Sequence, residues 1–150
     1  KLDDGQYDAI ILSACGLERI GYPERINQRF NIDTMLPAIG QGTIGIESRP
    51  DDAALNNLIQ VLNDADTHTC IRAERAMSAR LDAGCKVPVA GHAVLEGNDV
   101  VLRGVVAAID GSQTLTAEHR ASSDDVLELG RVVAEDLLQQ GAGALLKITP

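Results

Sequence analysis

The sequence predicts the end of an α/β domain followed by a small α+β domain. Residues 7–14 form a short and almost continuous apolar run, as in parallel strands that are covered on both faces. Residues 35–50 are rich in glycine and proline, and from residue 66 onward the order is helix, three strands, helix. Because no strand precedes the first run, residues 1 to about 36 are expected to complete a sheet that begins elsewhere.

The elements of the first half follow from turn residues and apolar spacing. Residues 15–21 predict a turn or a single helical turn, and residues 35–50 predict a hinge with one strand at 43–48. A helix is expected to begin at Pro50, where the acidic residues 51–52 suit a helix N-terminus. Its apolar residues recur at i, i+3, i+4 and i+7 and predict one face: Leu55, Leu58, Ile59 and Leu62.

In the second half, a helix is predicted from Asp66 to about Leu81, with Gly84 as its C-cap. Its apolar side carries Cys70, Ala73, Met77 and Leu81. Turn sequences at residues 96–99 and 110–111 separate three expected strands, which form an antiparallel meander. These strands are residues 87–95, 100–109 and 113–120.

A last helix is predicted over residues 126–140, capped by residues 122–124 and ended by Gly141. Its expected buried stripe is Val126, Leu129, Val133 and Leu137. Residues 144–148 form a short apolar tail. Residues 66–150 thus predict a domain with a core of its own.

Composition narrows the class of function. The chain has 150 residues, 45% of them hydrophobic, which suffices for one domain or two small ones. A net charge of −9 disfavours nucleic acid or an anionic membrane as the main partner, although local arginines can still hold a small anionic ligand. Three widely spaced cysteines do not form a disulfide pattern, and no signal peptide or membrane-spanning run is present, so a cytoplasmic protein is expected.

Residues 40–45 match the pattern G-x-G-x-x-G. Dinucleotide binding requires a strand before this pattern and a helix that begins on it, whereas here a strand-like stretch and then Pro50 follow. Two interpretations stay open. The segment is a flexible crossing between domains, or Gln41 and the bare backbone of Gly42 contact a ligand in a crevice.

Metal binding is not expected. The candidate ligands are His68, Cys70, Cys85, His92 and His119, and none forms a C-x-x-C or H-x-x-x-H pair. His68 and Cys70 stand two residues apart on a helix, so they point to different sides. Histidines at the surface are the better interpretation.

Cys85, in the stretch RLDAGCKVPVAGHA, has three interpretations. It is incidental to a capped turn, it carries a group permanently, or it is a nucleophile. The nucleophile is disfavoured, because the preceding helix C-terminus opposes thiolate formation and His92 lies seven residues away. Permanent attachment needs only an accessible sulfur on a rigid loop.

Arg19 follows the apolar run at residues 7–14. Open α/β sheets bind ligands at the carboxyl ends of their strands, and an arginine there can fork onto a carboxylate. The alternative is a solvated surface arginine.

Five stretches in one order carry a resemblance that covers nearly the whole chain: YDAIILSACGLERIG, LPAIGQGTIGIESRPDD, ERAMSARLDAGCKVPVAGHA, the DGS turn and AEDLLQQGAGALL. Together they resemble the C-terminal half of the porphobilinogen deaminases, also called hydroxymethylbilane synthases. Ala83, where a glycine is common, is a mild departure.

The resemblance implies an architecture and site residues. Residues 1–36 would end the second of two doubly wound domains that resemble periplasmic binding proteins. Residues 37–63 would be the crossing segment and the return to the first domain, and residues 64–150 the cofactor-carrying α+β domain. Cys85 would hold a dipyrromethane cofactor through a thioether, and Arg19, Gln41 and Gly42 would line its site.

The reaction implied is the head-to-tail addition of four porphobilinogen units to the tethered dipyrrole, with loss of ammonia, followed by hydrolysis to hydroxymethylbilane. The family's catalytic aspartate lies in the N-terminal half, so no catalytic residue is assigned here and the chain alone is expected to be inactive. It is expected to be a monomer, or to pair with an N-terminal half as a separate polypeptide. A non-catalytic binding domain and a thiol-dependent hydrolase remain alternatives.

Overall fold

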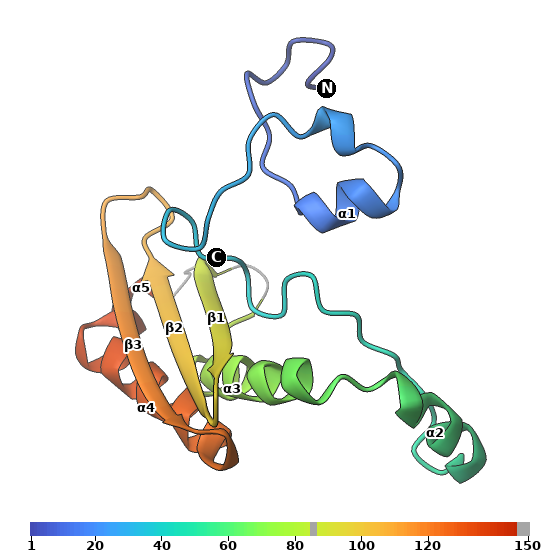
Figure 1. Ribbon diagram of the computed structural model, residues 1–150. Helices are drawn as coiled ribbons and strands as arrows, with labels where there is room; N and C mark the ends of the chain where they lie inside the picture. The colour runs from blue at the N-terminus through green and yellow to red at the C-terminus, as the bar shows by residue number, and fades with distance from the viewer. Residues whose placement is uncertain (85–86, 147–150) are drawn as a thin grey trace.

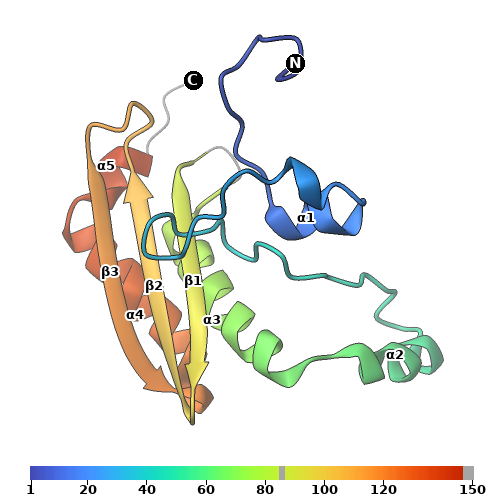
Figure 2. The same ribbon diagram turned by 45° about the horizontal axis from the view of Figure 1, so that its top comes forward.

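The computed structural model describes residues 1–84 and 87–146. Residues 65–146 form a three-stranded sheet with helices on one face, and residues 1–64 are extended chain with short helices beside it (Figures 1 and 2). The elements are α1 (Ala14–Arg19), α2 (Ala53–Ile59), α3 (Ala65–Leu81), β1 (Val89–Glu96), β2 (Asp99–Ala107), β3 (Thr114–Ser122), α4 (Val126–Gln139) and α5 (Ala142–Leu146). No helix in the described ranges is long and apolar enough to cross a bilayer.

The predicted meander is confirmed. The sheet order is β1-β2-β3 and both pairs are antiparallel. Glu96 pairs with Asp99, so the first turn holds two residues, and Gly97 has a φ of +67°. A type II′ hairpin requires such a φ at its first central position, which explains the glycine.

The core lies between the sheet and helices α3 and α4. The stripe predicted for the last helix is buried as expected: Val126, Leu129, Val133 and Leu137. From α3, the fully buried Met77 lies over two glycines of the sheet. A Cβ atom at Gly91 would stand 2.5 Å from its Cε, and one at Gly104 would stand 2.6 Å from its Sδ. The glycines therefore make room for the long side chain.

The other face of the sheet is crossed by the chain around residue 33. Arg103 of β2 stands directly opposite Glu118 of β3 and donates to its carboxylate at 2.5 Å. Arg103 also donates to Asp33, at 2.5 Å. The hydrogen bond to Asp33, followed by that to Glu118, raises the pKa of Arg103. The ion pair with Asp33 attaches the N-terminal part of the chain to the sheet.

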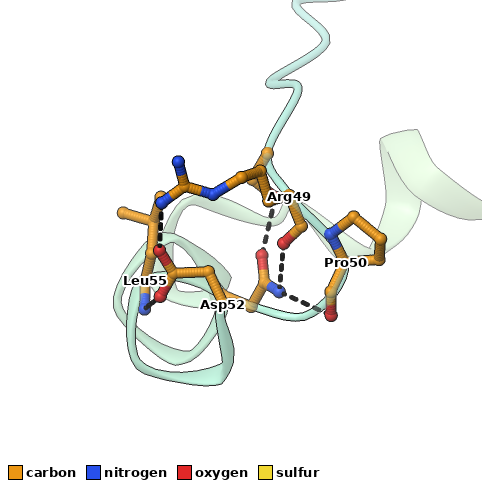
Figure 3. Close-up of polar contacts among 6 residues, drawn as sticks. Arg49, Pro50, Asp52 and Leu55 are labelled. Carbon is orange, nitrogen blue, oxygen red and sulfur yellow. Dashed lines mark hydrogen bonds and ion pairs between the residues drawn. The ribbon is translucent and has the colours of Figure 1, made fainter.

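Helix α2 begins at a side-chain cap (Figure 3). The Leu55 N–H donates to the Asp52 carboxylate at 3.1 Å, and Arg49 pairs with the other oxygen of that carboxylate at 3.0 Å. The Asn56 amide donates to the carbonyl oxygens of Arg49, at 3.0 Å, and Pro50, at 3.4 Å. An acidic N-cap satisfies free N–H groups and suits the positive end of the helix, so the expected start is confirmed to within a few residues.

Two expected strands are wrong. The expected strands at residues 7–14 and 43–48 belong to no sheet, and helix α1 begins at Ala14, the last residue of the first expected strand. A strand forms only with a hydrogen-bonded neighbour, and neither segment finds one within the described ranges. The apolar side chains of the first segment consequently remain exposed: Tyr7, Ile10, Ile11 and Leu12. Three members of the stripe expected on the helix that begins near residue 50 are exposed as well: Leu55, Leu58 and Leu62.

Candidate functional site

The crossing segment lies along the free edge of β1. The Gly91 N–H donates to the Pro37 carbonyl at 3.1 Å, and Ile39 packs against the core. Edge strands present unpaired backbone groups, and here the crossing segment satisfies part of them. The segment that carries Gln41 is thereby attached to the α+β domain.

Glu74 of α3 anchors the same segment. Its side chain is buried, with the residue only 4% exposed. One carboxylate oxygen accepts the Gly40 N–H at 2.8 Å, and the other accepts the Ala93 N–H of β1 at 2.9 Å. No motif singled out this residue in the sequence. A signal was present, however, because Glu74 stands four residues after Cys70 and three before Met77, on the inward side of the helix.

Gln41 and Gly42 lie on a tight turn just beyond this anchor. The Gln41 N–H donates to the Ala38 carbonyl at 2.9 Å, and the Thr43 N–H donates to the Gly40 carbonyl at 3.1 Å. Gly40 and Gly42 have φ values of +73° and +84°, which glycine adopts at little cost. Residues 43–49 are extended, so the G-x-G-x-x-G stretch does not open a helix and lacks the geometry of a dinucleotide site.

A groove of about 460 Å³ lies beside this turn, between α3 and β1. Its lining includes Gln41, Cys70, Glu74 and His92. Burial raises the pKa of the Cys70 thiol, and the charge of Glu74 raises it further. A thiol of raised pKa is a poor nucleophile near neutral pH. No three acidic, histidine or cysteine side chains gather as a metal site within residues 1–84 and 87–146.

Helix α1 carries Arg19 and contacts the turn through Cys15. The Ser13 hydroxyl caps the helix by accepting the Gly16 N–H at 3.4 Å. The Cys15 sulfur stands 3.5 Å from the position that a Cβ atom of Gly42 would take. Arg19 follows Cys15 by four residues, so both lie on one face of the helix.

The Arg19 side chain is exposed. Neighbouring arginines form ion pairs with carboxylates, as in Arg25 with Asp3 and Arg29 with Glu18. Arg19 has no such pair among residues 1–84 and 87–146, so its guanidinium remains available to an anionic ligand.

Cys85 and Lys86 lie outside the described residues. The expected cap at Gly84 is wrong, because Asp82 takes the left-handed conformation with a φ of +51°. The Asp82 N–H donates to the Ala79 carbonyl at 3.3 Å, and the next N–H, of Ala83, donates to the Ser78 carbonyl at 3.0 Å. This pair of bonds is a Schellman motif, in which aspartate takes the place usual for glycine.

Two family models match the chain. Residues 1–57 match the family model described as "Porphobilinogen deaminase, dipyromethane cofactor binding domain". Residues 68–139 match the model described as "Porphobilinogen deaminase, C-terminal domain". Arg19, Gln41 and Gly42 fall in the first match, and Cys85 falls in the second. The chain therefore belongs to the porphobilinogen deaminases, an enzyme family of tetrapyrrole synthesis whose cofactor is dipyrromethane.

Proposed function

We propose that this chain is the C-terminal part of a deaminating transferase that joins four porphobilinogen units into hydroxymethylbilane. Each addition forms a carbon–carbon bond between pyrrole units and releases ammonia, and a final hydrolysis consumes water. The proposal rests chiefly on the attachment of the 37–42 segment to β1 and α3, because it joins parts of both family matches in one body. Residues 1–36 would end a doubly wound domain, 37–63 would return to another, and 64–150 would carry the cofactor.

The residues of the chain fit a small anionic pyrrole. The Arg19 guanidinium is exposed and has no ion pair among residues 1–84 and 87–146, and such a group forks onto carboxylates like the acetate and propionate of porphobilinogen. Gln41 offers an exposed amide, and Gly42 lets a ligand approach its backbone because it has no Cβ.

The Cys85 sulfur would hold the dipyrromethane through a thioether and keep the growing product in register, which is a proximity effect. When bound, the cofactor supplies the pyrrole carbon to which the next unit is joined. A permanent bond needs no thiolate during turnover, so Cys85 need not have a strongly lowered pKa.

Proton transfer is proposed to depend on an aspartate of the N-terminal half, which would make this chain inactive alone. Residues 7–12 have a strand-like sequence but pair with no sheet, and their apolar side chains are exposed. This exposure supports a partner that covers them. An N-terminal half, as part of the same or a separate polypeptide, is the proposed partner.

The free thiols of Cys15 and Cys70 support the proposed cytoplasmic location. A monomer is proposed for the complete enzyme.

The intact mass of the chain tests the proposal. The chain is expressed with the N-terminal half of a porphobilinogen deaminase, as wild type, Cys85→Ser and Cys70→Ser. We expect a dipyrrole adduct and a colour with Ehrlich's reagent in the wild type and in Cys70→Ser, and neither in Cys85→Ser. Turnover is expected only when both halves are present.

Three outcomes would contradict parts of the proposal. A free thiol at Cys85 in an active preparation would refute the thioether. A free thiol together with no turnover when both halves are present would favour the alternative, a non-catalytic binding domain of the same fold. Turnover by the 150-residue chain alone would refute the assigned division of the catalytic residues.

A further inference from the structure

We propose that Glu74 is a positioning residue that holds the Gly40–Gly42 turn at the edge of the α+β domain. The inference rests on the proposed function, in which this turn lines the cofactor site. Glu74 touches neither Gln41 nor Gly42 through a hydrogen bond, so it would act through the backbone of Gly40. Its role would therefore be to orient the site and not to react.

The geometry matches this role. A buried carboxylate is costly unless its oxygens are hydrogen-bonded, and Glu74 accepts one N–H on each oxygen. The two donors belong to different elements, Gly40 of the crossing segment and Ala93 of β1. One side chain thus joins three parts of the chain, and bonds to a charged acceptor are roughly twice as strong as neutral ones.

The hydrogen bond between Glu74 and Gly40 lies directly before the residues that would line the site, so it can control their orientation. The bond between Pro37 and Gly91 and the packing of Ile39 hold the segment before the turn. Within the described residues, the Gly40 N–H is the last backbone group of the crossing segment that bonds to the α+β domain. Gln41 follows directly, so loss of the bond would release the turn from α3 while the earlier contacts persist.

Amide hydrogen exchange, measured by NMR on the 150-residue chain, tests the anchor. Glu74→Met removes both acceptors with a side chain of similar length. Because a hydrogen bond to a charged group is lost, we expect Gly40 to exchange roughly tenfold faster or more. In Glu74→Gln one oxygen remains, so only one of the Gly40 and Ala93 amides should stay protected.

Glu135→Gln is the matched control. It removes a carboxylate from the exposed pair with Arg80, whose atoms are 2.6 Å apart, and should leave Gly40 unchanged. The amides of β2 report whether the fold persists in every variant. Unchanged Gly40 exchange in both Glu74 variants, with a folded β2, would overturn the inference.

The enzyme formed with the N-terminal half separates positioning from a purely structural role. In Glu74→Met, which removes both acceptors, we expect slower turnover while the adduct mass at Cys85 stays the same. Full turnover in this variant would overturn the positioning role. If Gly40 responds as expected but the wild type carries no adduct and shows no turnover, the proposed function fails and the anchor stands.

Discussion

Gly130→Ala is expected to destabilise the α+β domain, although the change would normally favour a helix. Gly130 is buried in α4 where that helix crosses α3. A Cβ atom here would stand 2.4 Å from the Ala73 carbonyl oxygen, 2.6 Å from the Ala76 Cβ and 2.7 Å from the Met77 nitrogen. Real Cβ contacts essentially never fall below 3.0 Å.

The size of the stability loss depends on which atoms around the new Cβ can move. Alanine gains about 1 kcal/mol of helix propensity over glycine, whereas overpacking a core costs about 1–3 kcal/mol and occasionally more. The blocking atoms are backbone and Cβ atoms of α3, so no flexible side chain can move aside. The helices would have to separate by about 1 Å, which weakens their whole close-packed interface. We expect a net loss of about 2–3 kcal/mol, or roughly 10–20 °C in Tm.

Thermal unfolding followed by far-ultraviolet circular dichroism measures this loss. Fluorescence would not report on the domain, because the chain has no tryptophan and its tyrosines and phenylalanine all occur by residue 30. Gly143→Ala in α5 is the control, since the nearest atom to its Cβ is a Leu138 methyl at an ordinary 3.8 Å. We expect no loss in the control. A Gly130→Ala chain that melts at or above the wild-type temperature would refute the packing argument.

The remaining predictions concern the core and the pH dependence. Met77→Ala should lower the free energy of unfolding in urea by about 2–5 kcal/mol. Gly104→Ala should lower it less in the Met77→Ala chain than in the wild type, because the atom nearest to the new Cβ is the Met77 sulfur that the first change removes. Equal losses in the two chains would contradict this coupling. The hydrogen bond from Gln140, followed by that with His119, lowers the pKa of Asp136. A carboxylate whose pKa is lower in the folded state stabilises the fold at pH values above its unfolded-state pKa. This stabilisation is lost as the pH falls below about 4, toward the folded-state pKa. Asp136→Asn should therefore flatten the fall of the urea midpoint below about pH 4, and parallel curves would count against the contact.

Local signals predicted the α+β domain well. The turn sequence at residues 96–99 predicted the bend between the first two strands, and the spacing of Val126 to Leu137 predicted one buried helix face. The first signal depends on the backbone preferences of a few consecutive residues, and the second depends on a regular spacing of apolar residues. Both can therefore be recognised without the rest of the chain. Gly84 shows the limit at element ends, because Asp82 took the left-handed position two residues earlier.

The same kind of signal gave a different outcome in the first half. Helix α2 forms where its spacing predicts, yet Leu58 of its apolar stripe is 71% exposed. Residues 7–12 have the composition of a buried strand and remain unpaired. Periodicity indicates which residues can be buried, whereas burial needs a second surface, and within the described residues these segments have none.

The sequence by itself determined the order of elements from residue 65 onward, the helix stripes and the family, since these follow from local patterns and recurring motifs. Only the tertiary structure decided that the buried Glu74 joins the crossing segment to β1, and that the Cys15 sulfur lies beside Gly42. These contacts connect residues that are distant in the chain. The donors to Glu74 are backbone N–H groups, which every residue carries, so the spacing that places Glu74 on the inward side of α3 does not say which segments it holds.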